Sequence, residues 1–231
     1  MALIHQARLV PSKIELLGNW VPIQPWAGDA DTSTLRAVGA YRFDDPDGEV
    51  GIETHLLGTG DGQVLQVPLT YRGSPLTGAE SALVETMEHS VLGRRWVYDA
   101  VADPVYVRAV LTAILTGGTQ AELEYASPGG AVGREVTTRV RGSGRAGSAV
   151  PEPVAAVVAV KGGAVTTVSA GAVELDVVRV VDGTCGPDQR HTLTGTWPGR
   201  EAPAVLAVAR PARATVAANR ATAWGGMPVE L

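Results

Sequence analysis

Hydrophobic and polar positions alternate along three stretches of the first hundred residues. Residues 35–43, 49–57 and 63–72 show the two-residue period that is typical of half-buried strands, and residues 2–10 show a weaker form of it. The sequences DDPDG and GTGDG separate the three stretches and supply the glycines that tight turns need. The pattern therefore predicts an antiparallel meander.

A short helix is predicted just before this meander. Ser12 is followed three residues later by Glu15, which is the spacing of a capping box. Pro22 and Pro25 end the helix because proline cannot continue it. Its predicted apolar face consists of Ile14, Leu17 and Trp20.

A second helix has stronger signals. Asp103 is a good N-cap and Pro104 a good first residue, and the pair Gly117–Gly118 is a typical stop. The apolar stripe of this helix comprises Val107, Val110, Leu111 and Ile114. Just before it, residues 94–100 are predicted to be extended, whereas residues 82–92 fit a strand or a short helix almost equally well.

After Gly118 the chain becomes rich in valine. Strand-like stretches occur at 121–127, 134–142, 153–163, 164–183 and 202–211. Residues 142–153 are predicted to be a flexible connection, and residues 219–231 a loosely held tail. The predicted fold class is α+β, mostly antiparallel sheet, with one or two helices in the N-terminal half and a Val-rich β C-terminal half.

Composition excludes several classes of protein. The net charge is −5, and the only local basic cluster lies within 134–145, so we expect no nucleic-acid partner. Cys185 is the sole cysteine, which excludes an internal disulfide and suits a reducing cytoplasm. No stretch has the pattern of a signal peptide or a membrane span, so we expect a soluble cytoplasmic protein with no membrane partner.

The familiar motifs of cofactor and metal sites are missing. The four histidines show no ligand spacing, and the acidic turn at 44–48 lacks the later glutamate of a calcium loop. Lys161 stands beside two glycines without the full phosphate-binding pattern, and Ser143 lies in no nucleophile elbow. We therefore predict no metal, no cofactor and no assigned catalytic residue.

The most polar and aromatic segment is 87–104. Arg94 and Arg95 flank Trp96, and since neighbours on a strand point to opposite faces, one arginine could turn inward and pair with Asp99. Tyr98 would share a face with Trp96. The segment could be a ligand platform or a structural ion pair beside a helix start. The candidate ligand or interface residues are Glu85, His89, Arg94, Arg95, Trp96, Tyr98 and Asp99.

The stretch QVLQVPLTYRGSPL, followed by LGRRWVYDAVADPVYVRAVL, resembles the N-terminal cap domain of actinobacterial maltokinases. The upstream stretch NWVPIQPWAGD is similar to the tryptophan-bearing segment of that family. Standalone proteins of this kind often carry the label glucan branching protein, for which the sequence offers no chemistry. The resemblance implies a cap-like domain at 1–120 and a β-rich domain at 121–231, interpreted as a possible remnant of a kinase N-lobe.

The resemblance also implies a departure from kinase chemistry. Asp176 stands where such kinases carry a strand lysine for the nucleotide phosphates, and the residues that follow leave no room for a catalytic lobe. We therefore expect a non-catalytic binding or regulatory protein of sugar or glucan metabolism, with a sugar kinase, a second copy or a carbohydrate as partner. The alternatives are a small carbohydrate-active enzyme that uses Asp99 and Glu85, or one half of a split sugar kinase completed in trans.

Overall fold

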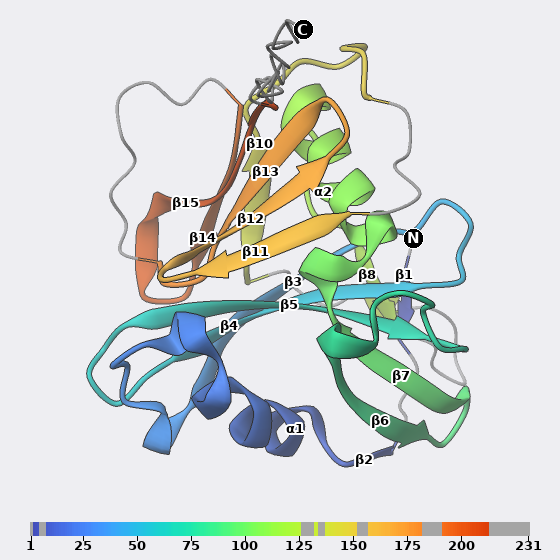
Figure 1. Cartoon of the computed structure of the whole chain (residues 1–231), viewed down its shortest axis with the longest axis vertical. Helices are drawn as coiled ribbons and strands as arrows, with labels where there is room; N and C mark the ends of the chain where they lie inside the picture. The colour runs from blue at the N-terminus through green and yellow to red at the C-terminus, as the bar shows by residue number, and fades with distance from the viewer. Residues whose placement is uncertain are drawn as a thin grey trace, which may run out of the picture.

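The protein folds into two six-stranded antiparallel sheets, a small three-stranded sheet and two α-helices within the residues that the structure describes (Figure 1). The computed structural model describes residues 2–4, 8–125, 132–133, 137–151, 157–181 and 191–212. Both α-helices lie in the N-terminal half. The predicted α+β class is confirmed.

The N-terminal sheet has the strand order β2-β6-β7-β5-β4-β3. Its strands are β2 (Leu9–Val10), β3 (Arg36–Phe43), β4 (Gly51–Gly58), β5 (Val64–Arg72), β6 (Leu83–His89) and β7 (Gly93–Asp99). The meander β3-β4-β5 is confirmed, and the ambiguous stretch 82–92 contains a strand and a turn. The stretch 2–10 does not form one strand, because β1 (Ala2–Ile4) and β2 belong to different sheets.

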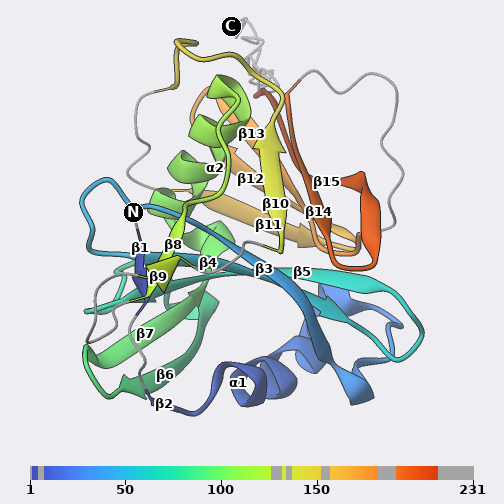
Figure 2. The same ribbon diagram turned by 180° about the vertical axis from the view of Figure 1, so that it is seen from behind.

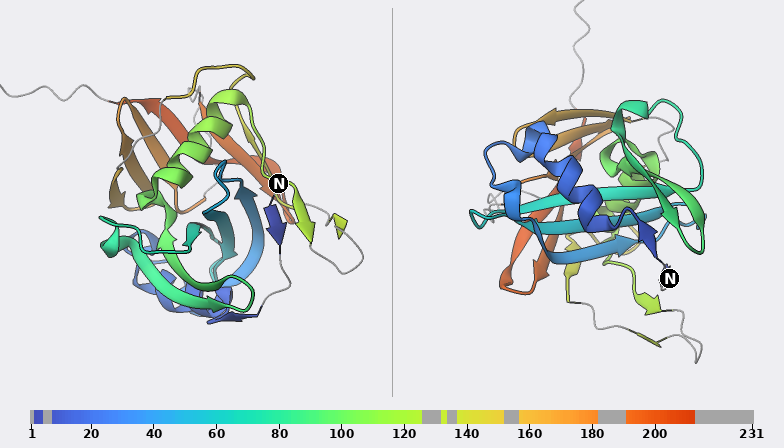
Figure 3. Two further views of the ribbon diagram at one scale, coloured as in Figure 1. Left: turned by 90° about the vertical axis from the view of Figure 1, so that its right-hand side faces the viewer. Right: turned by 90° about the horizontal axis from the view of Figure 1, so that it is seen from below.

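Helix α1 (Lys13–Trp20) crosses one face of this sheet, as the view from below in Figure 3 shows. The predicted capping box between Ser12 and Glu15 is present. The predicted apolar face is confirmed at Leu17, which is buried, but Ile14 is 47% exposed and Leu16 is buried in its place. Two short 3-10 turns follow, at Val21–Ile23 and Pro25–Ala27.

The C-terminal sheet has the strand order β10-β14-β15-β13-β12-β11. Its strands are β10 (Arg139–Gly142), β11 (Val158–Gly162), β12 (Val165–Ala170), β13 (Val173–Val178), β14 (Thr192–Trp197) and β15 (Arg200–Pro211). The sequence did not predict β14, because Gly195 interrupts its pattern. In the structure, a Cβ on Gly195 would lie 2.6 Å from Leu206 Cδ1, so a larger residue would force the Leu206 side chain to move.

Helix α2 (Pro104–Thr116) packs beside β10 on the C-terminal sheet (Figure 2). Its predicted start and stop are confirmed: the Asp103 side chain accepts a hydrogen bond from Val105 N, and Gly117 adopts φ +72°. The helix and the C-terminal sheet share a core with the face of the N-terminal sheet that lies opposite α1. This face contributes Tyr41, Phe43, Ile52 and Leu56.

The sequence predicted that a flexible connection begins at residue 142, but residues 142–145 are held against the end of α2. Gly144 N and Arg145 N donate to the carbonyl oxygens of Ile114 and Leu115, which are among the last carbonyls of α2. A Cβ on Gly142 or Gly144 would overlap the backbone of this helix. The Gly-Ser-Gly sequence therefore terminates α2, a role that requires close backbone approach.

The two halves of the chain meet along the edge of β5. Strand β7 pairs only with Leu69–Arg72 of β5, and residues 179–181 occupy the remaining edge. Gln66 N donates to Arg179 O, and Val181 N donates to Val64 O, both at 2.8 Å. A third, small sheet, β1-β8-β9, joins β8 (Leu123–Tyr125) and β9 (Val132–Gly133) to the N-terminal strand. The division at residue 120 stays a prediction, and residues 219–231 lie outside the described part.

Candidate functional site

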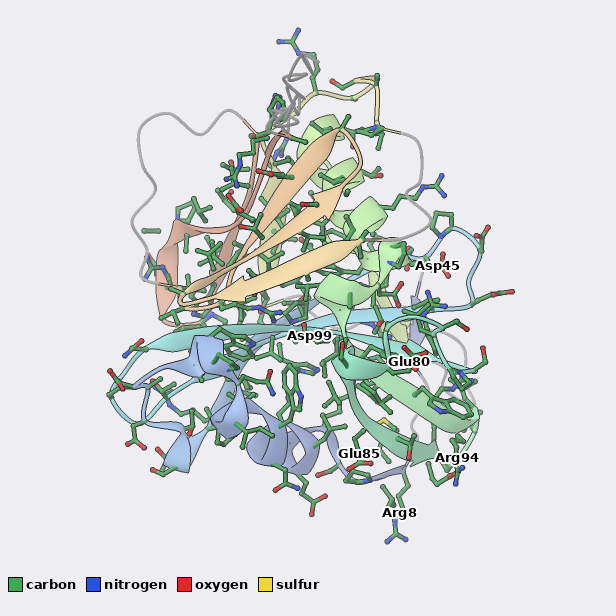
Figure 4. All side chains as sticks on the ribbon, viewed as in Figure 1. Arg8, Asp45, Glu80, Glu85, Arg94 and Asp99 are labelled. Atoms are coloured by element: carbon green, nitrogen blue, oxygen red, sulfur yellow. The ribbon has the colours of Figure 1, made fainter. Side chains whose placement is uncertain are left out.

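The predicted site residues lie on the β6–β7 hairpin, but they do not converge on one point. Glu85 and Arg94 lie at the outer edge of the molecule, whereas Asp99 lies where the two sheets meet (Figure 4). Arg94 Nε lies 3.1 Å from Glu88 Oε1, and both side chains are about 60% exposed. An exposed pair of this kind contributes little to stability.

His89 and Arg95 hold the turn between β6 and β7. The ring atom His89 Nδ1 accepts hydrogen bonds from Val91 N and Leu92 N at 3.2 and 3.0 Å. Arg95 Nη2 donates to Leu92 O at 2.9 Å. These hydrogen bonds give both side chains a structural role in the turn, and their predicted role in ligand binding stays a prediction.

Trp96 and Tyr98 lie on the same face of β7 and pack in one apolar cluster. Tyr98 is only 2% exposed, because residues 76–82 cover it, and its hydroxyl accepts a hydrogen bond from Leu76 N at 2.9 Å. The segment that covers this face belongs to the N-terminal half. Trp96 remains half-buried, so a ligand platform at this position stays a prediction for Trp96 alone.

Asp99 does not pair with Arg94 or Arg95, and the prediction of such a pair was wrong. Its partner is Arg179, whose Nη2 lies 2.8 and 2.9 Å from the two carboxylate oxygens. Both side chains are completely buried. The sequence could not show this pair, because its members are 80 residues apart and meet only when the two halves join.

Arg179 has two further contacts that hold it in place. Its Nε donates to Thr166 Oγ1 at 2.9 Å, and its guanidinium carbon lies 4.9 Å from the ring centroid of Trp26. The Nη1 atom has no hydrogen-bond partner in the described part of the chain. The arrangement combines a buried ion pair, in which Nη2 donates to both carboxylate oxygens, with a cation–π contact, and it leaves Asp99 inaccessible.

Asp103 is also engaged. Arg72 Nε and Nη2 lie 2.7 and 2.8 Å from its two oxygens, while the same carboxylate caps α2. Since Asp99 and Asp103 are buried in ion pairs and Glu85 is exposed, the structure does not bring these carboxylates together as an acid–base pair. The geometry that glycoside chemistry needs is not formed by them.

A different group of side chains converges on the α1 face of the N-terminal sheet, and the sequence did not predict it. We call it the basic–acidic cluster, which comprises Lys13, Arg42, Glu53, His55 and Tyr71.

Lys13, the first residue of α1, forms an ion pair with Glu53 of β4, and its ammonium lies 5.4 Å from the ring centroid of Tyr71. His55 Nε2 lies 3.3 Å from Tyr71 Oη and 3.8 Å from Glu53 Oε2. Arg42 stands directly opposite Glu53 on the neighbouring strand β3.

The acidity of the cluster departs from ordinary values. Burial raises the pKa of Glu53, but the electrostatic interactions with His55, Lys13 and Arg42 outweigh it and lower the pKa to about 2. Burial lowers the pKa of His55, so its ring is neutral at pH 7 and becomes charged only in acid. Burial also raises the pKa of Tyr71 well above its usual value. At neutral pH the cluster therefore carries two cations and one anion.

The signal of the cluster was present in the sequence but could not be interpreted without strand register. Glu53 and His55 are two residues apart on β4 and therefore share a face. Only the pairing of β3 with β4 places Arg42 beside them, and only the docking of α1 adds Lys13. Lys13 is one of just two lysines in the chain, which marks it in retrospect.

The described residues were considered for a metal site and for a membrane-spanning helix. Among them, no group of three or more His, Cys, Asp or Glu side chains could hold a metal ion. No helix of the described segments has both the length and the apolar character needed to cross a membrane.

The comparisons with known proteins place this geometry in context. Residues 20–103 match the family model of the maltokinase N-terminal cap domain, which confirms the resemblance. The matched region contains Arg42, Glu53, His55 and Tyr71, whereas Lys13 precedes it. No curated protein matches the chain.

Proposed function

We propose that this chain is a non-catalytic binding or regulatory protein of sugar or glucan metabolism that acts on a sugar kinase or on a second copy of itself. The observation that carries the proposal is the match of residues 20–103 to a domain that is named as a part of maltokinases. A cytoplasmic location would fit this role, and cell fractionation would test it.

The surroundings of the acidic side chains support the absence of catalysis by this chain alone. Asp99 and Asp103 are held by Arg179 and Arg72, so neither is free to move a proton. A general acid or base must reach its substrate within hydrogen-bond distance, and a completely buried carboxylate cannot.

The environment of Asp176 on β13 supports the same conclusion. This residue stands where the resemblance would place a phosphate-binding lysine. In the structure it accepts a hydrogen bond from Thr167 Oγ1 at 2.6 Å and forms an ion pair with Arg210. A carboxylate at this position repels a nucleotide phosphate.

The decisive assay measures ATP-dependent phosphorylation of maltose and glucosamine by the purified protein. We expect none, and turnover by the chain alone would overturn the proposal. The same assay with a maltokinase added tests regulation: we expect a change in kcat or KM that saturates as the concentration of this protein rises. If neither kinetic constant changes and size-exclusion chromatography detects no kinase complex and no self-association, the proposal also fails.

A third arm separates the split-kinase alternative. If an isolated kinase C-terminal lobe, inactive by itself, becomes active only when this protein is added, the chain supplies a part of the active site. That result would replace the regulatory role.

A further inference from the structure

The basic–acidic cluster contains two cations for one carboxylate. Lys13 forms the close ion pair with Glu53, whereas Arg42 acts on Glu53 through its charge alone and belongs to none of the close ion pairs among the described residues. Arg42 Nε is buried and has no hydrogen-bond partner within the described segments. A half-buried guanidinium loses water on folding and regains that free energy only if an acceptor is present. The Nε atom of Arg42 therefore lacks an acceptor among the described residues.

The cluster reaches the surface of the protein, where an acceptor from outside the chain can approach it. The Lys13 side chain is 34% exposed and the Glu53 side chain 12% exposed, in contrast to the completely buried Asp99–Arg179 pair. Gly51 of β4 stands opposite Tyr71 of β5. A Cβ on Gly51 would lie 3.4 Å from Tyr71 Cβ and 3.8 Å from Arg42 Nη2. Because this position carries no side chain, nothing attached to it covers the Arg42 guanidinium.

The charges of the cluster decide which ligand fits. Two cations and one carboxylate leave one positive charge, and the Glu53 carboxylate is already occupied by Lys13. The neutral His55 ring and the Tyr71 hydroxyl lie beside these charges and can provide neutral hydrogen bonds. Guanidinium and ammonium groups together are the usual ligands of phosphate and carboxylate groups.

We propose that the basic–acidic cluster binds the phosphate or carboxylate group of a small molecule, with Arg42 as its main ligand and Lys13 as its second. This inference does not depend on the regulatory role proposed above, because anion binding can be measured on the purified protein without a kinase.

Titration with inorganic phosphate at constant ionic strength, followed by calorimetry and by the NMR signal of the His55 ring, tests the site. Ionic strength must be fixed because salt screens exposed charges. We expect saturable binding with Kd in the millimolar range, roughly tenfold weaker in Arg42→Met and in Lys13→Met, since each loses a charge-assisted hydrogen bond. The matched control is Arg36→Met, which removes the same charge from the exposed start of β3 and should leave Kd unchanged.

One variant has an effect of opposite sign. Glu53→Gln removes the only negative charge of the cluster, so an anion should bind several-fold more tightly. A ligand that donates hydroxyl groups to Glu53, such as a sugar, should instead bind more weakly. Parallel titrations with acetate and glucose separate these cases, with acetate expected to bind and glucose not.

Three results would overturn the proposal. They are the absence of phosphate binding to the unmodified protein, an equal Kd in Arg42→Met and the unmodified protein, and weaker phosphate binding in Glu53→Gln. The urea midpoint of each variant shows that it is folded before its Kd is compared.

Discussion

The Asp99–Arg179 pair and the basic–acidic cluster both take charge out of water, yet they differ in what they leave available. The first is completely buried, and it joins the end of β7 in one half of the chain to Arg179, the residue after β13, in the other half. The second lies on the sheet face beneath α1, is partly exposed, and contains a guanidinium without a carboxylate partner in the described segments. Buried charge by itself therefore does not identify a binding site.

The difference follows from where each group lies in the fold. Asp99 ends β7, at the point where residues 179–181 take over the edge of β5, so sheet pairing brings its partner to it. Arg42 lies across from a carboxylate that α1 has already neutralised through Lys13. A closed pair stabilises or specifies the fold, whereas leftover charge can serve a ligand.

The largest expected effect comes from opening the closed pair. Arg179→Met removes the arginine that pairs with the completely buried Asp99 carboxylate, which should lower the free energy of unfolding by about 3–5 kcal/mol. Urea denaturation measures the loss. The control is Arg200→Met on the C-terminal sheet, because the Arg200 guanidinium lies 5.6 Å from the ring centroid of Trp197 and forms no ion pair among the described residues. A loss no larger than that of the control would show that the pair is not a stabilising unit.

Removing both members should cost much less than the single changes suggest. In a double variant with Asp99→Leu and Arg179→Met neither charge of the pair stays buried without the other, so the double-mutant cycle should give a coupling energy of about 2 kcal/mol or more. Additive losses would mean that Thr166 and Trp26, and not Asp99, account for the importance of Arg179.

The sequence predicted the local elements well and the long-range charge partners poorly. The cap at Asp103, the stop at Gly117 and the capping box of Ser12 depend on neighbouring residues, and all three were confirmed. The partner of Asp99 and the members of the basic–acidic cluster depend on strand register and on the docking of distant segments. These are properties that periodicity does not encode.

The misinterpreted segments have the same explanation. Gly142 and Gly144 had the composition of a linker, but their lack of side chains serves to bring their backbone against the end of α2. Ile14 was assigned to the apolar face of α1 from helical spacing. The rotation of the helix on the sheet leaves Ile14 exposed and buries Leu16 in addition to Leu17.

An intermediate effect is expected from pH at the open cluster. A carboxyl group whose pKa falls from its ordinary value to about 2 on folding stabilises the protein above pH 4.5, and this contribution is lost as the pH falls toward 2. The lowered pKa of His55 acts in the same direction. As the pH falls, the unfolded chain takes up the His55 proton at a higher pH than the folded protein does, so protonation favours the unfolded state.

Urea denaturation of the unmodified protein and Glu53→Gln between pH 7 and pH 3 tests this expectation. The unmodified protein should be more stable by about 1–2 kcal/mol at pH 7, and the difference should shrink below pH 4.5. Glu85→Gln is the control, because Glu85 is exposed and, among the described residues, its side chain accepts a hydrogen bond only from Thr86 N. A difference that stays constant with pH would show that Glu53 is not held ionised by its neighbours.

The smallest expected effect on stability belongs to Arg42→Met, and it separates the two regions most sharply. Methionine keeps most of the aliphatic volume of arginine, and among the described residues the Arg42 guanidinium takes part in no hydrogen bond or close ion pair that the change would break. The free energy of unfolding should therefore change by less than about 0.5 kcal/mol, against several for Arg179→Met. If Arg42→Met costs as much as Arg179→Met, Arg42 is part of the structural framework of the sheet. If stability is kept while phosphate binding is lost, a half-buried cation has been retained for a ligand and not for the fold.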